Sequence, residues 1–478
     1  MGYKAGVDKK QLALLPASVD EYVPEDHICR VIHAFIGQLD MSALGFKHAE
    51  ATSTGSPPYD PRMLLGLYLY GYLHRVRSSR RLEAETMRNV EVMWLLDGLR
   101  PDDKTISNFR KDNTHALREA FRAFVQMCRR LGLYGEELVA TDSVKFRAQN
   151  SLKRNYNETV VKNELSRIEK KIAEYMNALE QGDREEAGEE RPSAAAIRCA
   201  LEALKERKVK FEALHKRVEA EGEISAVDSE ARLMRSGGDG RKLDVGYNVH
   251  TVVDSKYHMI VGFELTNNAH DSGNLYRMSE QAKEAMEASE LTNLADKGYY
   301  NSEDIARCEG SGVSCLVAKP RAGGAPRKAE GFNREDFVYD GENDRYICPC
   351  KNPLEYRRTV KKNGGREYRV YANYPACNSC PMKSECTKYK YREIIRLPCQ
   401  DVVDIVDKRT RDNKELYHRR QEIVEHVFGT VKAVWGYKQF LCRGKQKVTG
   451  ETSLAYMAYN MRRVVNIFKE SKLMPVFG

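Results

Sequence analysis

Five short apolar runs, separated by helical stretches, constrain the fold of this chain most strongly. They lie at 138–144, 247–253, 259–265, 291–295 and 313–318. Asp254-Ser255-Lys256-Tyr257 joins the second run to the third, so these two are predicted to form a hairpin. Helices are expected between the later runs, at about Leu275–Ala288 and Asn301–Cys308. A hairpin followed by strands that alternate with helices predicts an α/β fold, with a mixed sheet covered by helices.

Residues 1–136 predict an all-helical N-terminal domain. Asp60 and Pro61 are typical of a helix start, and Arg62–Leu73 is apolar on almost every face, so we expect this helix to be buried. Apolar periodicity predicts further helices at Ile28–Leu39, Ser79–Met87, Val90–Leu96, Pro101–Arg110 and Leu117–Leu131.

Two insertions interrupt the predicted sheet. Residues 155–222 are highly charged with a break at Gly182–Pro192, which predicts a hairpin of two long helices. Residues 322–400 show little helical periodicity and carry six of the twelve cysteines. The predicted core therefore occupies 137–154 and 223–321. It is completed at 401–478 by helices at Arg409–Trp435 and Thr452–Phe468.

The composition indicates which partners and which cellular compartment suit the protein. Lys and Arg (78) exceed Asp and Glu (69), for a net charge of +9, which is compatible with a polyanionic partner without requiring one. No apolar run is long enough to span a membrane, and Met1–Asp8 lacks the apolar core of a signal peptide. We therefore expect a cytoplasmic protein whose cysteines do not form a disulfide framework.

Three acidic residues stand where metal-dependent phosphodiester chemistry would need them. Asp142 and Asp296 come at the ends of predicted buried strands, and Glu425 lies near the edge of the apolar face of a predicted helix. Carboxylates delivered in this way can hold two divalent cations. Taken singly, each has an ordinary alternative as a turn cap or a solvated surface charge, and Glu422 is a rival for the helical position.

Several segments resemble the Asp-Asp-Glu transposases of bacterial insertion sequences, in particular the eleven-eighty-two family. These segments are Pro61–Arg81, Pro101–Arg110, Tyr247–His250, Ala295–Tyr299, Val424–Gly429 and Ala458–Arg463. The resemblance implies a ribonuclease-H-like core in which Asp142, Asp296 and Glu425 bind two Mg²⁺ or Mn²⁺ ions. It also implies transposition by DNA nicking and joining.

Related transposases share a helical signature of Tyr, two residues, Arg, three residues, Glu, six residues and Lys. Lys432 stands at the required spacing from Glu425, and its alternatives are a phosphate contact or a solvated lysine. Gln421 and His418 occupy the Arg and Tyr positions of the signature. Tyr417 and Arg420 each come one residue early, roughly 100° around the helix. This offset argues against a catalytic role for Tyr417 or Arg420 but not against Glu425.

Two basic clusters are candidates for DNA contacts. The first follows an apolar helix and contains Arg75, Arg77, Arg80 and Arg81, which favours an end-recognition domain related to helix-turn-helix proteins. The second contains Arg443 and Lys445, with Trp435 and Tyr437 nearby as stacking surfaces. The alternatives are a solvated basic face for the arginines and ordinary core positions for the aromatic residues.

A cysteine cluster within 322–400 has two interpretations. Its members are Cys348, Cys350, Cys377, Cys380 and Cys386. A Cys-x-x-Cys pair with upstream partners resembles a structural zinc ribbon, although Cys348 and Cys350 are separated by one residue rather than two. Cys386 could replace one of them. The alternative is a reduced, metal-free loop.

These observations lead to a functional hypothesis. We expect a DNA transposase that binds the terminal inverted repeats of its own insertion sequence. It would catalyse metal-dependent cleavage and strand transfer on double-stranded DNA, as a homodimer or larger assembly on the nucleoid. Two alternatives are a catalytically inactive DNA-binding remnant and a metal-dependent nuclease without strand transfer. The charged helical insertion would serve as a dimer contact or a DNA clamp.

Overall fold

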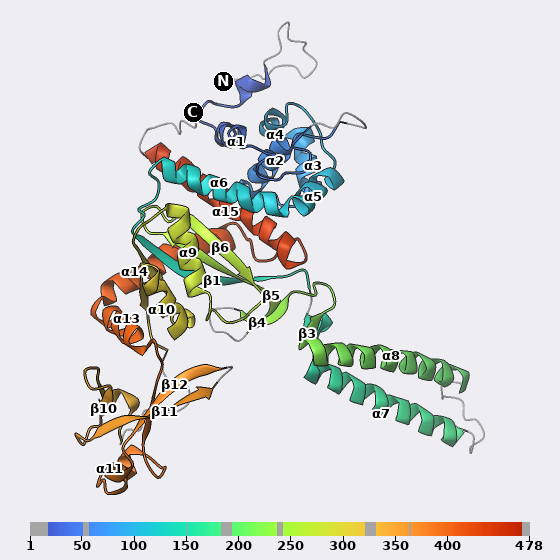
Figure 1. The fold of residues 1–478 in the computed structure, drawn as a ribbon. Coiled ribbons are helices and arrows are strands. Elements are labelled where there is room, and N and C mark those ends of the chain that lie inside the picture. The colour runs from blue at the N-terminus through green and yellow to red at the C-terminus, as the bar shows by residue number, and fades with distance from the viewer. Residues whose placement is uncertain are drawn as a thin grey trace, which may run out of the picture.

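The computed structural model describes residues 18–50, 57–150, 152–182, 194–236, 242–320, 331–362 and 365–470. A central sheet is covered by helices, and a helical region lies above it in Figure 1. A two-helix hairpin and a second small sheet project from the opposite side, well apart from each other (Figure 1). The two insertions therefore leave the central sheet in different directions.

The central sheet is mixed, as the sequence predicted. Its strands are β1 (Leu138–Arg147), β4 (Arg232–Ser236), β5 (Lys242–Asp254), β6 (Ile260–Thr266), β7 (Leu291–Ala295) and β8 (Val313–Val317). The order is β4-β5-β1-β7-β8, and β6 pairs with β5. β1 runs antiparallel to β5 and parallel to β7, which runs parallel to β8. β1 extends beyond its predicted end, and the edge strand β4 was not predicted.

The N-terminal helices follow the predicted pattern closely. They are α1 (Ile28–Gly37), α2 (Pro61–Leu73), α3 (Ser79–Arg88), α4 (Val90–Leu95), α5 (Asp103–Asp112) and α6 (Thr114–Arg130). The Asp60 side chain accepts a hydrogen bond from the Arg62 backbone N–H, at 2.8 Å, and Pro61 begins α2. α2 is buried along nearly its whole length, which confirms the expectation of a core helix.

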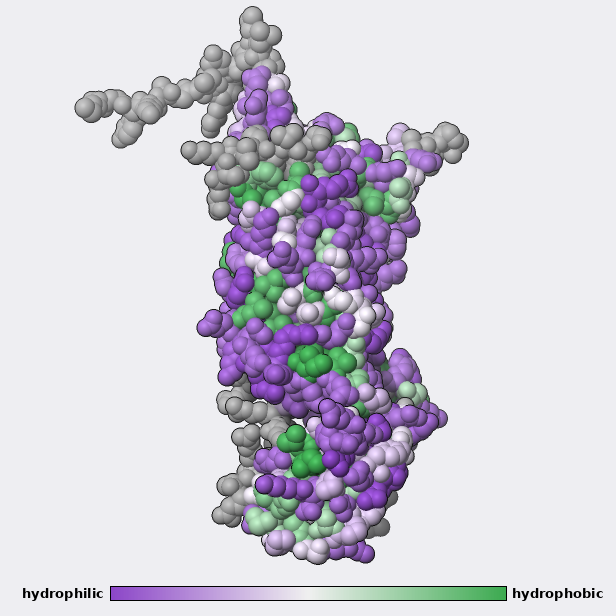
Figure 2. Space-filling model, turned by 60° about the vertical axis from the view of Figure 1, so that its left-hand side comes forward, coloured by the Kyte–Doolittle hydropathy of each residue, from purple (hydrophilic) through white to green (hydrophobic). Residues whose placement is uncertain are grey.

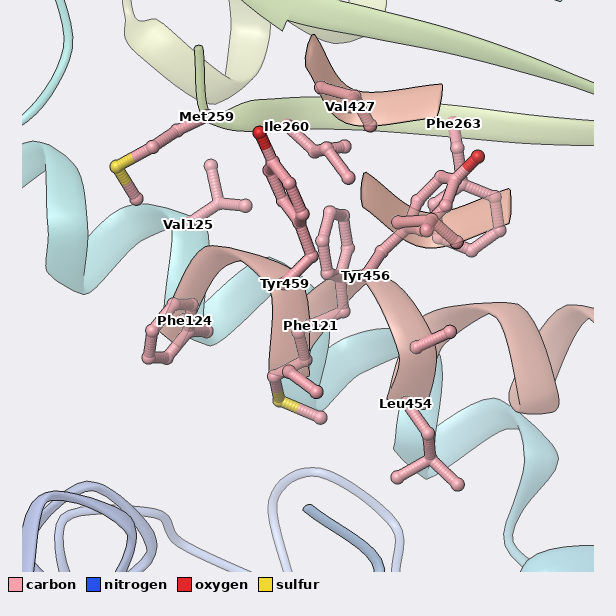
Figure 3. Packing of buried hydrophobic residues seen from close by; sticks show 14 of the residues in the cluster. Phe121, Phe124, Val125, Met259, Ile260, Phe263, Val427, Leu454, Tyr456 and Tyr459 are labelled. Carbon is pink, nitrogen blue, oxygen red and sulfur yellow. The ribbon is translucent and has the colours of Figure 1, made fainter. Parts of the chain in front are cut away.

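The last helix, α15 (Lys445–Glu470), joins these helices to the sheet. It packs against α2 and α6 on one side and β6 on the other. Figure 3 shows Tyr456 and Tyr459 of α15 between Phe121 and Val125 of α6 and Ile260 of β6. The N-terminal helices and the sheet therefore share one hydrophobic core.

The first insertion is the predicted helical hairpin. α7 (Glu158–Gly182) and α8 (Ala194–Glu221) pack together and project into solvent (Figure 1). Most of the predicted break at Gly182–Pro192 lies outside the described residues. The sequence did not predict the two-stranded ribbon of β2 (Asn155–Asn157) and β3 (Glu223–Ser225), which closes the base of the hairpin.

The second insertion contains a five-stranded antiparallel sheet that sequence periodicity did not reveal. Its strands are β9 (Val338–Asp340), β10 (Arg345–Ile347), β11 (Pro353–Lys362), β12 (Arg366–Ala372) and β13 (Glu393–Arg396), with short helices α11 (Tyr374–Asn378) and α12 (Lys383–Cys386). The order is β13-β12-β11-β10-β9. Three of these strands have four residues or fewer, which leaves too little apolar alternation to recognise.

The prediction of one helix at Arg409–Trp435 is wrong. The chain forms α13 (Gln400–Asp412) and α14 (Lys414–Phe428), and a π-helical turn follows at Gly429–Val434. The helices separate at Asn413, whose side chain donates to the Arg409 carbonyl at 2.9 Å and so competes with the backbone pattern. The π turn changes the helical phase, and Val434 at its end is 56% exposed.

The face of the molecule drawn in Figure 2 is mainly hydrophilic, with small, separated hydrophobic patches. Within the described ranges, none of the helices combines the length and apolar character needed to cross a membrane.

Candidate active site

Strand pairing brings Asp142 and Asp296 to matching positions. The parallel register of β1 and β7 places Thr141 opposite Ala295. Asp142 is the next residue of β1, and Asp296 is the first residue after β7. Because parallel strands run in the same direction, the two aspartates follow the same register pair on neighbouring strands.

Arg420 joins these two carboxylates. Its Nη1 lies 3.0 Å from Asp142 Oδ2, and its Nη2 lies 3.3 Å from Asp296 Oδ1. Arg420 comes from α14 and is only 9% exposed. The offset from the transposase signature argued against a role here, yet the structure places Arg420 between the two aspartates. The sequence signal was present as a Tyr-x-x-Arg pair, Tyr417 and Arg420, shifted by one residue.

Asp142 occupies an electrostatically unusual position. Burial raises the pKa of its carboxyl to about 6, and the charges of Asp296 and Asp271 act in the same direction. The Ser143 backbone N–H, 2.7 Å from Asp142 Oδ1, and the Arg420 guanidinium oppose this rise in the pKa. The site therefore gathers three acidic side chains around one directly bound guanidinium.

Asp271 is the acidic residue that sequence reasoning missed. It follows β6, and its Oδ1 accepts hydrogen bonds from Ser143 Oγ at 2.7 Å and Asn248 Nδ2 at 2.8 Å. A Cβ atom at Gly298 would lie only 2.8 Å from Asp271 Oδ2, so glycine lets the chain after Asp296 pass close by. The polar loop that directly follows a predicted strand was the available signal.

Glu425 has a different orientation from Arg420. It is exposed on α14, five residues after Arg420, which corresponds to roughly 140° around the helix axis. The side chain of α14 that contacts Asp142 and Asp296 is Arg420. Glu422 is exposed as well. The structure thus brings two of the three predicted acids together, and the place of the third stays a prediction.

Lys432 lies beside the strand that carries Asp142. Its Nζ donates to the Lys145 carbonyl at 3.2 Å and lies 5.9 Å from the centre of the Phe146 ring. Burial lowers the pKa of the Lys432 ammonium. It is therefore a half-buried group next to β1 rather than a freely solvated lysine.

The arginines of the first basic cluster separate into two kinds. Arg75, Arg80 and Arg81 are exposed in the turn after α2 and along α3. Arg77 faces inward, donates to the Gln439 carbonyl at 3.1 Å and lies 4.5 Å from the centre of the Tyr437 ring. Arg77 thus ties the N-terminal helices to the segment that precedes α15.

The second basic cluster also divides. Arg443 is exposed, whereas Lys445 begins α15 and donates its backbone N–H to Glu230 Oε2 at 2.8 Å. Tyr437 is only 2% exposed and belongs to the core, and Trp435 packs partly buried against the same core. For Tyr437 the core alternative holds.

Comparison with protein families identifies the class of the chain. Residues 17–112 match a transposase domain (DUF772), and residues 347–465 match a transposase DDE domain. No curated protein matches the chain significantly. The protein thus has a catalytic domain of the phosphoryl-transferring DDE class. More particularly, it is a DDE-type transposase with a DUF772 domain on its N-terminal side, which implies DNA transposition. The DDE match includes Arg420 and Glu425, whereas Asp142 and Asp296 precede it.

Proposed function

We propose that this transposase belongs to the eleven-eighty-two family. It binds the terminal inverted repeats of its own insertion sequence and cleaves and transfers DNA strands there with divalent metal ions. The convergence of Asp142 and Asp296 on Arg420 carries the proposal. Two carboxylates from neighbouring parallel strands, held by a helical side chain, form the start of a two-metal site.

The strand order supports a ribonuclease-H-like core. Its five main strands are arranged as β6-β5-β1-β7-β8, which is the third, second, first, fourth and fifth strand of the core in chain order. Only β5 runs against the other four. This order places Asp142 of β1, and Asp296 directly after β7, on neighbouring strands in the middle of the sheet.

The donor atoms at the site fit Mg²⁺ or Mn²⁺. Carboxylate oxygens are the ligands that these ions prefer, and a few of them suffice because Mg²⁺ retains several waters. Asp142 and Asp296 would hold the ions, with Glu425 as the third ligand. When bound, the ions lower the pKa of a water and stabilise charge on the departing 3′-oxygen. Arg420 offsets the charge of the two aspartates and would bind a DNA phosphate when the metal ions take its place between them.

Three acids are candidates for the third ligand. Glu425 fits the spacing to Lys432, Glu422 lies one turn earlier, and Asp271 is the acid that influences the Asp142 carboxyl in this structure. We propose Glu425, which reaches the site when α14 adjusts to DNA and metal. Asp271 would position Ser143 and β1 through its hydrogen bonds.

Double-stranded DNA is the proposed partner. The exposed Arg75, Arg80 and Arg81 would contact end-DNA phosphates, with Lys432, Arg443 and Lys445 near the cleavage site. Because transposition joins two ends, a homodimer or larger assembly on DNA is expected. Arg80→Ala should weaken the binding of end DNA equally for all sequences. It should also reduce the slope of the logarithm of the binding constant against the logarithm of the salt concentration by about one. Unchanged salt dependence would remove Arg80 from the interface.

The decisive experiment incubates the purified protein with labelled terminal DNA and Mg²⁺. Nicked and joined products are both expected. Nicks without joining would favour the nuclease alternative, and binding without nicks would favour the inactive remnant. Terminal DNA with a scrambled repeat serves as the control, and equal cleavage of the two DNAs would contradict end recognition.

A further inference from the structure

The second insertion gathers five thiols around one small cavity. The cavity has a volume of about 30 Å³ and is lined by Cys348, Cys350, Cys377, Cys380 and Cys386. Phe332, Phe337 and Leu354 form part of its wall. The volume suits a single ion or water molecule, and the five thiols that line the cavity are partly exposed.

The sulfur atoms of Cys350 and Cys380 lie 3.8 Å apart. A disulfide would place them about 2.05 Å apart. Thiolates at about 2.3 Å from a tetrahedral Zn²⁺ are separated by about 3.8 Å, which is the edge of that tetrahedron. The two thiols, which come from separate parts of the insertion, therefore have the spacing of ligands that share a metal.

Two donor groups lie at the cavity. The Asn352 backbone N–H points at Cys348 Sγ at 3.3 Å. The Arg392 guanidinium lines the cavity as well. Both groups would favour the thiolate form that binds a cation.

The insertion has a small hydrophobic core. Its hydrophobic cluster contains Phe337, Tyr346, Leu354, Tyr371 and Ile394 as buried members. Small units with so few buried side chains commonly depend on a disulfide or a metal. The contact between Cys350 and Cys380 joins the turn at Cys348–Cys350 to the segment between α11 and α12.

We propose that the insertion binds one structural Zn²⁺ through four thiolates. Cys350 and Cys380, whose sulfur atoms already lie 3.8 Å apart, supply two of them, and two of the other thiols that line the cavity, Cys348, Cys377 and Cys386, move in to supply the rest. A site with four sulfur ligands has no open position for water, so the ion stabilises the fold rather than acting in catalysis. The inference is independent of the proposed DNA chemistry.

Among the described residues, the group of three metal-binding atoms that already lie close together belongs to the N-terminal helical region and not to the cysteine cluster, and it has a simpler explanation. His27, Cys29 and Glu91 bring one ligand atom each within 4.8 Å of the others. However, His27 Nδ1 accepts from the Cys29 backbone N–H at 3.3 Å, and Glu91 accepts from the Tyr70 hydroxyl at 2.6 Å. Burial raises the pKa of Cys29 to about 12, which keeps the thiol protonated. His27 thus caps α1, and Glu91 binds the Tyr70 hydroxyl, without a metal.

The test measures metal in the purified full-length protein after dialysis. One equivalent of zinc is expected in the wild type and in Cys399→Ser, whose thiol lies in the same insertion but away from the cavity. Cys380→Ser and the double variant Cys348→Ser/Cys350→Ser should lose it. A zinc-free wild type, or zinc retained by Cys380→Ser, would overturn the proposal.

Cobalt substitution keeps the test independent of how the variants fold. Wild-type protein loaded with Co²⁺ should show the visible absorption of tetrahedral thiolate ligation. Octahedral cobalt spectra, or iron with inorganic sulfide in place of zinc, would contradict the proposed site.

Discussion

The acidic site and the cysteine cluster are organised in opposite ways. Asp142 and Asp296 are positioned by strand register, and Arg420 is held by a helix of the large common core. The five thiols lie beside a hydrophobic cluster that has five buried members. Strand register thus positions two of the three proposed ligands of the first site before any ion arrives, whereas the second site, as proposed, needs an ion to complete its fold. Loss of metal from the acidic site should therefore remove activity, whereas loss of metal from the cysteine cluster should disrupt local structure.

The largest effect should come from removing the charge at Asp142. Asp142→Asn is expected to reduce cleavage of terminal DNA by at least about 10³-fold, as for other residues that act directly in catalysis. End-DNA binding and the thermal unfolding temperature should change little, because the core is already formed without metal. Gel assays of cleavage and binding on the same preparation measure both effects.

Glu137→Gln is the matched control for Asp142→Asn, since Glu137 is an exposed carboxylate directly before β1. It should retain wild-type cleavage. An active Asp142→Asn protein would remove Asp142 from the site, and an unfolded one would show that its role includes stability.

Substitution at Glu425 tests whether α14 supplies the third metal ligand. Glu425→Gln is expected to lower cleavage about 10²-fold or more if it ligates metal during the reaction. Asp271→Asn should cost only about tenfold, as is usual for groups that orient a ligand. Cleavage rates of Glu425→Gln, Glu422→Gln and Asp271→Asn, measured side by side, decide which of the three acids is the third ligand. A dead Glu422→Gln with an active Glu425→Gln would move the assignment by one turn.

Arg420→Gln tests the ion pair that holds the acidic site together. Without metal it should lower the free energy of unfolding by about 2 kcal/mol, because two neighbouring carboxylates lose their shared cation. The side chains of Asp142 (26% exposed) and Asp296 (35% exposed) retain some solvent, so the loss is smaller than for a fully buried pair. Millimolar Mg²⁺ should restore part of this stability by binding the folded state.

Arg419→Gln is the control, since Arg419 is an exposed neighbour on the same helix. Denaturant unfolding with and without Mg²⁺ gives both quantities. If the two variants were equally stable and neither responded to Mg²⁺, Arg420 would not be the group that neutralises the two aspartates in the absence of metal.

Much of the fold was predictable because the core elements carry strong local patterns. The hairpin of β5 and β6, the strands β7 and β8 and the capped helix α2 all follow from apolar periodicity and turn residues. Asp142 and Asp296 became candidates for the same reason, since Asp142 lies within an apolar strand and Asp296 directly follows one. Arg420 and Asp271 were not, because their importance lies in contacts across long sequence distances. The small sheet β9–β13 was missed because its strands are short and its buried side chains few.

Removal of zinc should have the smallest effect on the reaction and a local effect on structure. After treatment with a strong zinc chelator, residues 331–400 should lose hydrogen-exchange protection while β1 and β7 keep theirs, since regions with few buried contacts open independently. Cleavage of terminal DNA, assayed with Mg²⁺ restored, should change by no more than about threefold, because the sheet that holds Asp142 and Asp296 does not depend on the insertion's core. Protease digestion provides a second readout, with new cuts expected within 331–400. Loss of protection throughout the central sheet would show that the two regions fold as one unit, and the contrast between them would then be wrong.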